Sequence, residues 1–212
     1  MLSTMSTAPP ALKGDGNGRY RILIVGNSGV GKSTTMRRLS SLLGISAVSL
    51  DLLYFKPGWK AHTPEEFLKQ VRSFTELNDE WIIDGNYLSK LKDVTYKQAT
   101  DIVWLDPPAL LYLPRVFIRT MRRLFGIPKS VDATPVGCQD TFTDVFFGGK
   151  DSILLWAITR HSVVREQYTP MHAIDAVEKG GKWRRLGGWG STARAWFEQL
   201  DELAKHRRER MA

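Results

Sequence analysis

Residues 26–33, Gly-Asn-Ser-Gly-Val-Gly-Lys-Ser, constrain the fold of this chain more than any other stretch. They satisfy the pattern G-x-x-x-x-G-K-[ST], in which backbone N–H groups of a glycine-rich loop surround phosphate oxygens. The flanking residues supply the strand and the helix that such a loop requires. Residues 20–25 are apolar and β-branched, and residues 32–43 carry an apolar helical face that ends at Gly44. The sequence therefore predicts a strand, a phosphate-binding loop and a helix in succession.

The residue types of the loop fit the binding of a polyphosphate. Gly26, Gly29 and Gly31 lack a Cβ atom, so their backbone can adopt positive φ and approach phosphate oxygens closely. We expect Lys32 to reach the β- and γ-phosphates and the hydroxyl of Ser33 to ligate Mg²⁺. The alternative is a glycine-rich turn before an ordinary helix, since the four fixed positions recur by chance in about one percent of chains of this length. The predicted phosphate-binding residues are Gly26, Asn27, Ser28, Gly29, Val30, Gly31, Lys32, Ser33 and Thr34.

Short apolar strands alternate with helical segments along most of the chain. This alternation is typical of an α/β fold with a parallel sheet covered by helices on both faces. After the loop helix, strands are expected at residues 46–50, 81–83, 102–105 and 182–186. Thr63 and Glu66 form a capping box that predicts the start of a helix. Ligands of such sheets bind at the carboxyl ends of the strands, where Asp51, Asp84 and Asp106 fall.

The bulk composition fits one globular domain. We expect a single domain at residues 19–208, with a disordered tail at residues 1–18 and a lid at residues 126–150. A single cysteine, Cys138, together with the lack of a secretory signal and of a long apolar run, predicts a cytoplasmic protein without a membrane span. The net charge of +8 fits either phosphorylated small molecules or nucleic acid as partners.

A predicted helix at residues 110–124 is basic on one side. Arg115, Arg119 and Arg122 are spaced i, i+4, i+7 and share a face, and no acidic residue lies between positions 107 and 131. Solvated helices usually alternate charge sign, so this block favours a role in binding anions. Arg115 and Arg119 are the best candidates for stabilising a phosphoryl group during its transfer. The alternative is a solvated basic face.

Several blocks of the chain, in the same order, resemble one group of proteins. The matching blocks include residues 26–33, the Ser-Leu-Asp at residues 49–51, and the Trp-Ile-Ile-Asp-Gly-Asn-Tyr at residues 81–87, which is the most specific. The chain is similar to adenylate-kinase-like P-loop proteins of the nucleoside and nucleotide kinase-like superfamily. More narrowly, it resembles the DNA topology modulation proteins over residues 21–123. The resemblance implies a five-stranded parallel sheet of order 2-3-1-4-5 that binds ATP or a related nucleoside triphosphate with Mg²⁺.

Three carboxylates at the predicted ligand edge are candidate site residues. Asp84 follows three apolar residues, as the acidic residue of a Walker B strand does, so we expect it to hold Mg²⁺ through water. The alternative for Asp84 is a cap of the turn at Gly85. Asp51 falls where related kinases place a group that binds the acceptor or accepts its proton, and it can equally cap a turn. Asp106 has a similar apolar lead-in, but the prolines after it fit a cap at the start of a helix equally well.

Two functions fit these features. The first is ATP-dependent phosphoryl transfer by a nucleotide-type kinase to a small-molecule acceptor that rests near Asp51 and Asn86. Tyr54, Trp59 and Tyr87 would either stack on such an acceptor or belong to the core. The second is a nucleotide-dependent DNA-binding regulator with ATPase activity, which the basic charge would fit. DNA affinity measured against salt concentration separates the two functions.

Overall fold

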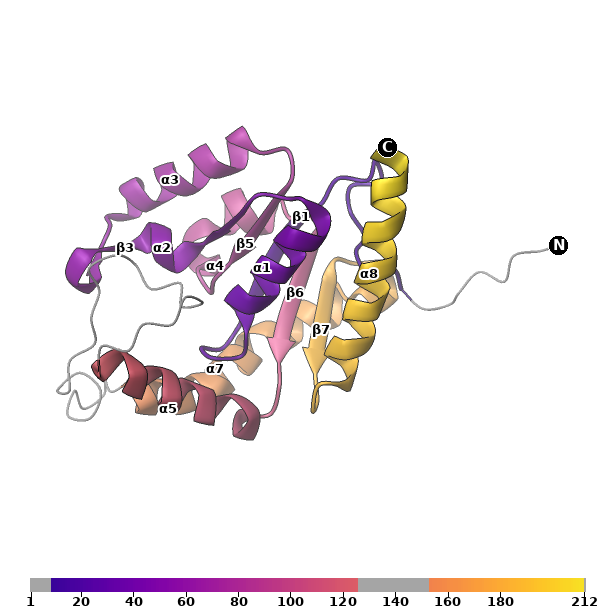
Figure 1. Cartoon of the computed structure of the whole chain (residues 1–212). Coiled ribbons are helices and arrows are strands. Elements are labelled where there is room, and N and C mark those ends of the chain that lie inside the picture. The colour runs from indigo at the N-terminus through magenta and orange to yellow at the C-terminus, as the bar shows by residue number, and fades with distance from the viewer. Residues whose placement is uncertain (1–8, 126–152, 212) are drawn as a thin grey trace.

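The structure is a computed structural model that describes residues 9–125 and 153–211. Its centre is a sheet of five parallel strands in the spatial order β2-β5-β1-β6-β7 (Figure 1). Numbered along the chain within this sheet, the order is 2-3-1-4-5, the order that the resemblance implies. The strands are β1 (Arg21–Gly26), β2 (Ala47–Ser49), β5 (Trp81–Asp84), β6 (Asp101–Asp106) and β7 (Trp183–Gly187).

A short antiparallel hairpin stands apart from this sheet. It consists of β3 (Phe55–Lys56) and β4 (Lys60–Ala61), joined by a turn at Pro57–Trp59. The hairpin follows α2 (Leu50–Tyr54), a five-residue helix that begins directly after β2. The sequence predicts only an irregular segment here, because two-residue strands are too short to give an alternating pattern.

Alternating side chains of β1 supply the core on both faces of the sheet. Ile22 and Ile24 belong to a cluster with helices α1, α5 and α8, whereas Leu23 and Val25 belong to a cluster with α3, α4 and α7. Because both faces are covered, the strand is a continuous apolar run. The helices are α1 (Lys32–Leu43), α3 (Pro64–Leu77), α4 (Leu88–Leu91), the π-helical turn Lys92–Tyr96, α5 (Ala109–Leu124), α7 (Ile153–Ile174), the 3-10 turn Val177–Lys179 and α8 (Ser191–Met211).

Helix α3 begins at the predicted capping box. The hydroxyl of Thr63 accepts a hydrogen bond from the backbone N–H of Glu66 at 3.2 Å, and the carboxylate of Glu66 accepts one from the backbone N–H of Thr63 at 3.0 Å. Phe67 and Val71 follow on the buried face. The capping box is therefore confirmed, because all of its signals are local in the sequence.

Residues 9–18 are packed against the domain, so the predicted disordered tail is wrong for these residues. Ala11 and Leu12 are 6% and 4% exposed. The backbone N–H groups of Lys13 and Gly14 donate hydrogen bonds to the carboxylate of Asp101 at 2.6 and 3.0 Å. This apolar pair and several hydrogen bonds to distant residues hold the segment without any periodic pattern, which is why its sequence resembles a tail. The predicted tail at residues 1–8 and the predicted lid at residues 126–150 lie outside the described residues.

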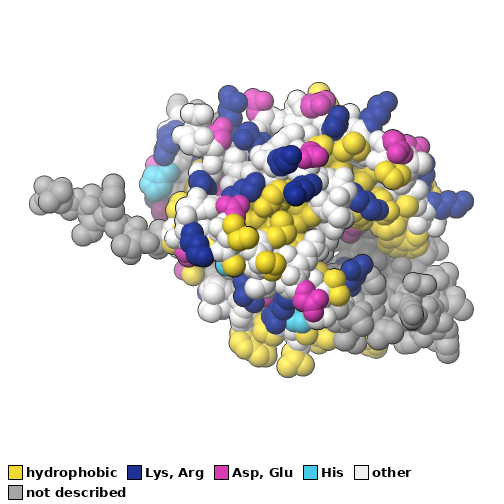
Figure 2. Space-filling model, turned by 180° about the vertical axis from the view of Figure 1, so that it is seen from behind, with side chains coloured by type: hydrophobic (Ala, Val, Ile, Leu, Met, Phe, Trp, Pro, Cys, Tyr) yellow, Lys and Arg dark blue, Asp and Glu magenta, His cyan; other side chains and the backbone are white. Residues whose placement is uncertain are grey.

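The distribution of charge on the surface bears on whether nucleic acid is a partner. Figure 2 shows Lys and Arg side chains intermixed with Asp and Glu side chains, and the described residues on that face form no continuous basic surface. A nucleic-acid-binding face is expected to cluster basic residues instead. In the described part of the chain, no helix is long and apolar enough to cross a membrane.

Candidate functional site

The loop after β1 has a backbone that only glycine accommodates at two positions. Gly26 and Gly29 have φ values of 141° and 79°. A Cβ atom at Gly26 would clash with the carbonyl oxygen of Leu105 in β6, and one at Gly29 would clash with the side chain of Val116 in α5. Both glycines are therefore required because β6 and α5 pack directly against the loop.

The remaining predicted loop residues differ in what they can offer a ligand. The side chain of Val30 belongs to the core, so only its backbone can face a phosphate. Gly31 caps helix α1 with a φ of 102°, and Thr34 is exposed in the first turn of that helix. Helix α1 begins at Lys32, so its free N-terminal N–H groups adjoin the loop.

Lys32 is folded over the loop. Its ammonium group donates hydrogen bonds to the carbonyl oxygens of Gly26 and Asn27 at 3.0 and 2.9 Å. Burial lowers the pKa of Lys32, and the nearby carboxylates of Asp51 and Asp84 oppose this shift. The structure therefore brings the predicted catalytic lysine and two predicted carboxylates together at the carboxyl edge of the sheet.

Asp84 and Ser33, the two predicted metal ligands, are in direct contact. The hydroxyl of Ser33 donates a hydrogen bond to Oδ2 of Asp84 at 2.7 Å. Asp84 is buried at the end of β5, and burial raises its pKa, while the hydroxyls of Ser49 and Ser33 and the ammonium of Lys32 oppose that shift. Oδ1 of Asp84 is also buried and has no hydrogen-bond partner among the described residues.

The donor set of this pair fits Mg²⁺. A buried carboxylate oxygen without a partner lies beside a hydroxyl oxygen, and both are hard oxygen ligands of the kind that Mg²⁺ prefers. Among the described residues, no group of three or more His, Cys, Asp or Glu side chains could hold a metal ion. Mg²⁺ is usually bound through one or two protein groups, several waters and substrate phosphates.

Helix α5 delivers one of its two predicted arginines to the loop. Nη2 of Arg119 donates a hydrogen bond to the hydroxyl of Ser28 at 2.8 Å, and the charge of Arg119 acts on Lys32. Arg115 lies one turn earlier, is exposed, and hydrogen-bonds to none of the described residues. The placement of Arg119 therefore agrees with a role at the loop, and a role for Arg115 stays a prediction.

Asn86 is a structural part of the loop that the sequence reasoning assigned to the acceptor. Its side-chain oxygen accepts a hydrogen bond from the N–H of Gly26 at 3.0 Å, and its Nδ2 donates to the carbonyl of Gly26 at 2.6 Å. The hydroxyl of Tyr168 in α7 donates to the same side-chain oxygen at 3.3 Å. Asn86 therefore fixes the first residue of the loop, and an acceptor resting near it stays a prediction.

A buried chain of hydrogen bonds supports the loop from the other side. Nδ2 of Asn27 donates to the hydroxyl of Tyr112 in α5 at 2.8 Å, and that hydroxyl lies 2.9 Å from Nδ1 of His161 in α7. Burial lowers the pKa of His161, with a further contribution from the charge of Arg165. No local pattern signals this chain of hydrogen bonds, because its bonded residues are 85 and 49 positions apart.

Asp106 is neither a metal ligand nor a helix cap. Its buried carboxylate accepts hydrogen bonds from Nε of Arg165 at 2.8 Å and from Nε of Arg185 at 2.9 Å. The two arginines come from α7 and β7, so the carboxylate ties both elements to the end of β6. Both readings offered by the sequence are corrected, because neither anticipated partners 59 and 79 residues away.

Aromatic side chains surround Asp51 on the α2 side of the loop. The hydroxyl of Tyr87 donates a hydrogen bond to Oδ1 of Asp51 at 2.9 Å. The Tyr87 ring packs against the rings of Tyr54 and Phe67, with centroids 4.9 and 5.1 Å away. Trp59 packs edge-on against Phe55 of the hairpin. These contacts favour packing over acceptor stacking for Tyr54 and Tyr87.

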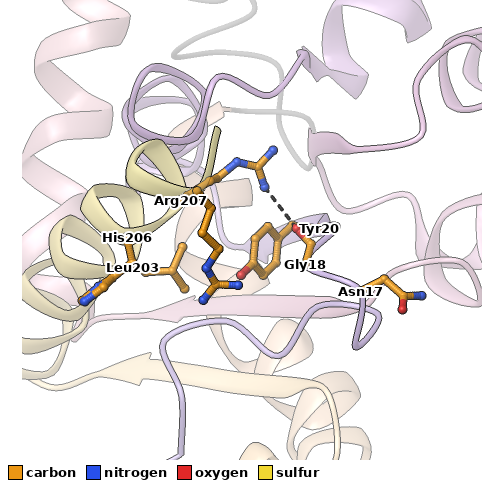
Figure 3. A pocket seen from close by; sticks show the side chains of 7 residues that line it. Asn17, Gly18, Tyr20, Leu203, His206 and Arg207 are labelled. Carbon is orange, nitrogen blue, oxygen red and sulfur yellow. Dashed lines mark hydrogen bonds between the residues drawn. The ribbon is translucent and has the colours of Figure 1, made fainter. Parts of the chain in front are cut away.

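A cavity of about 440 Å³ lies far from this site. It is lined by the segment before β1 and by the last turns of α8, with Tyr20, His206 and Arg207 among its walls (Figure 3). The segment enters β1 at its amino end, whereas the loop follows the carboxyl end of the same strand. This cavity therefore does not belong to the candidate site.

Comparison with known proteins finds similarity of structure at low sequence identity. The sequence matches no protein-family model and no curated protein. A sugar kinase from Janibacter sp. HTCC2649, solved without ligand, shares 15% identity at a TM-score of 0.44, over 90% of this chain and 95% of that chain. A shikimate kinase from Bacteroides thetaiotaomicron shares 15% identity at a TM-score of 0.48, over 88% and 98%. A shikimate kinase from Acinetobacter baumannii in complex with shikimate shares 16% identity at a TM-score of 0.47, over 89% and 94%.

Proposed function

We propose that this protein is a phosphotransferase that moves the γ-phosphoryl group of ATP, or of a related nucleoside triphosphate, to a small-molecule acceptor. The observation that carries the proposal is the convergence of four groups on the glycine loop. Lys32 and Arg119 supply positive charge, and Ser33 with Asp84 supplies oxygen ligands. Phosphoryl transfer needs little covalent chemistry from the protein, so positioning and charge stabilisation of this kind are the main requirements.

Each group has a distinct task in this proposal. The loop N–H groups and the start of α1 bind phosphate oxygens, and Lys32 exchanges its two loop carbonyls for the β- and γ-phosphates. Ser33 and Asp84 would hold Mg²⁺, which neutralises phosphate charge when it is bound. Arg119 is hydrogen-bonded to Ser28 of the loop, where it can stabilise charge on the phosphoryl group during its transfer.

The loop is held in shape before any ligand arrives. Asn86 fixes Gly26 by two hydrogen bonds, and Tyr112 fixes Asn27 from the opposite side. A preformed loop avoids the entropy of ordering its backbone during binding. These supports therefore favour tight positioning of the triphosphate rather than induced fit of the loop.

The alternative of a nucleotide-dependent DNA-binding regulator rests on the net charge of +8, and the narrower membership in the topology modulation group rests on sequence resemblance alone. The face shown in Figure 2 intermixes both signs of charge in its described residues. A shallow dependence of any residual DNA affinity on salt would agree with the kinase proposal.

The proposal predicts that Lys32→Ala loses phosphoryl transfer while the fold is retained. Removing a charge-stabilising donor of the reaction lowers the rate by about 10²- to 10³-fold. The measurement is the formation of nucleoside diphosphate from Mg²⁺-ATP, with circular dichroism as the check of folding. Lys69→Ala, which removes an exposed lysine from α3, is the matched control. Wild-type turnover in Lys32→Ala would refute the assignment.

A further inference from the structure

One cavity of the molecule carries positive charge on its walls and lies apart from the candidate site. It has a volume of about 440 Å³ and is formed between the segment before β1 and the last turns of α8 (Figure 3). Its lining includes His206, Arg207 and Arg210 and no acidic residue. Cavities of about 300–1,000 Å³ are the usual size for small organic ligands. The size and the charge together indicate a small organic anion.

Glu80 holds the walls of this cavity in place. Its carboxylate accepts a hydrogen bond from the backbone N–H of Tyr20 at 3.0 Å and hydrogen bonds from both terminal nitrogens of Arg207. Nη1 of Arg207 also donates to the carbonyl of Gly18 at 3.2 Å. The segment before β1 and helix α8 are therefore joined before any ligand binds, and Glu80 already compensates the charge of Arg207.

Two hydrogen-bond donors at the cavity remain unpaired. Arg210 is exposed, and it forms no hydrogen bond or ion pair with residues 9–125 and 153–211. The hydroxyl of Tyr20 likewise forms no hydrogen bond within these residues. Burial raises the pKa of Tyr20, so the hydroxyl stays a donor near neutral pH, while the charges of Arg207 and Arg210 oppose that shift. An unpaired guanidinium and an unpaired hydroxyl therefore act on the same cavity.

The cavity also offers an apolar surface beside these donors. Leu203 of α8 and the aromatic ring of Tyr20 both line it, and both are only partly buried. An inorganic anion would leave this surface in contact with water, which is unfavourable for apolar groups. An organic group attached to the anion would cover it.

Basic residues near a helix C-terminus also have a structural explanation. They offset the partial negative charge of the helix dipole, and Arg208 and Arg210 both lie in the last turn of α8. That role explains the charge of the two arginines equally. It does not explain why Arg210, and not Arg208, lines a cavity beside an unpaired hydroxyl. Arg208 is therefore the matched control for Arg210.

We propose that this cavity binds a small organic phosphate monoester. The phosphate group would pair with the guanidinium of Arg210 and accept a hydrogen bond from the hydroxyl of Tyr20, and the organic part would cover Leu203 and the Tyr20 ring. A guanidinium can donate two parallel hydrogen bonds to one phosphate. The cavity lies at the amino end of β1 and the glycine loop follows its carboxyl end, so this inference is independent of the proposed function.

The local charge favours a phosphate over a carboxylate. Outside the ion pair with Glu80, residues 205–211 carry three exposed cations and one exposed carboxylate. These residues are Lys205, Arg208, Arg210 and Glu209. The excess of two positive charges matches a phosphate monoester dianion, whereas a monocarboxylate would leave one of them uncompensated.

The test uses phenyl phosphate as the probe, because it joins a phosphate dianion to a small flat ring. It is titrated calorimetrically into the whole protein at physiological ionic strength, where charge effects over long distances are screened. Saturable binding at one site is expected. Benzoate keeps the ring but carries a single negative charge, and it is expected to bind at least about threefold more weakly. No saturable binding of phenyl phosphate, or equal affinity for benzoate, overturns the inference.

Variants then determine whether the probe occupies the cavity. Arg210→Glu replaces an attraction by a repulsion and is expected to weaken binding at least about tenfold. Arg208→Glu makes the same change of charge in the same helical turn and is expected to change the affinity by less than about twofold. Tyr20→Phe keeps the ring, removes one hydrogen bond and is expected to weaken binding about threefold. Equal losses in Arg208→Glu and Arg210→Glu overturn the inference, because helix charge alone would then explain them.

A last variant separates the cavity from the glycine loop, which binds phosphate in the proposed function. Lys32→Ala is expected to bind phenyl phosphate with the affinity of the wild type, because Lys32 lies beyond the opposite end of β1. Circular dichroism checks that each variant is folded. Binding that is lost in Lys32→Ala and retained in Arg210→Glu would assign the probe to the loop and overturn the inference.

Discussion

At the residue scale, Asp84 is a residue of the candidate site whose burial costs stability. Its carboxylate is buried, and Oδ1 has no hydrogen-bond partner among the described residues. Burial raises its pKa, which means that the native state binds the proton more tightly than the unfolded chain does. This contribution to stability is present below the unfolded-state pKa and is lost as the pH rises through the folded-state pKa.

We therefore predict that Asp84→Asn stabilises the ligand-free protein at neutral pH. The amide keeps the size of the side chain and removes a buried charge with an unpaired oxygen, so the free energy of unfolding should rise by about 1–3 kcal/mol. The gain should vanish below about pH 4, where aspartate is protonated in both states. Urea unfolding across this pH range measures the difference. A variant less stable than wild type at pH 7 would contradict the account.

Single residues also mark the limit of sequence reasoning about the site. Lys32, Ser33 and Asp84 were predictable because each is defined by its distance from a glycine or from an apolar strand. The partner of Asp51 was not, because Tyr87 is 36 residues away and meets it only after β2 and β5 pair. Side-chain contacts across strands leave no local pattern in the sequence.

At the element scale, helix α3 shows a start that is encoded locally and is sensitive to pH. Hydrogen bonds from Lys56, from the backbone of Thr63 and from His62 lower the pKa of Glu66 to about 2. A carboxylate with a lowered folded-state pKa stabilises the native state above its unfolded-state pKa. That contribution is lost as the pH falls through the folded-state pKa.

We predict that Glu66→Gln lowers the melting temperature at pH 7 and that the difference from wild type shrinks between pH 4.5 and about pH 2. The neutral amide loses the charge-assisted contacts, whose value disappears once Glu66 is protonated. Thermal unfolding followed by circular dichroism measures this. Glu65→Gln removes a charge from the same helical turn and is the control for the helix dipole. A difference that persists unchanged at pH 2 would speak against this role.

Helices and strands were predictable where the sequence pattern that marks them lies within one continuous segment. The strands, the loop helix and the capping box follow from apolar periodicity and cap residues that lie within one segment. The β3–β4 hairpin and the π-helical turn Lys92–Tyr96 were missed because each is too short to show a period. The sequence predicts both the loop and helix α5. Only the packed structure shows that Arg119 hydrogen-bonds to the loop and that Arg115 does not.

At the scale of the whole molecule, the sheet order explains why one edge holds every candidate group. Strand β1 is central, with β5 and β6 as its neighbours, so the loop after β1 lies between the ends of both. Asp84 enters from β5, and α5 follows β6 to bring Arg119. In open α/β sheets, ligands bind outside the carboxyl ends of the strands at such a position.

The packed segment at residues 9–18 shows what the sequence could not reveal at this scale. Its apolar pair, Ala11 and Leu12, fills the core beside α8, and Nε1 of Trp196 donates a hydrogen bond to the carbonyl of Ala11 at 2.8 Å. Two apolar residues amid Pro, Gly and polar residues give no periodic pattern. The segment becomes ordered only because residues far away in the sequence pack against this apolar pair.

The binding of a triphosphate tests the central claim most directly. A non-hydrolysable ATP analogue is titrated calorimetrically into the wild type and into Lys32→Ala, each with and without Mg²⁺. The account predicts saturable binding at one site of the wild type, tighter with Mg²⁺ and weakened by at least about tenfold in Lys32→Ala. Absence of saturable binding, or equal affinity in both proteins, would contradict it.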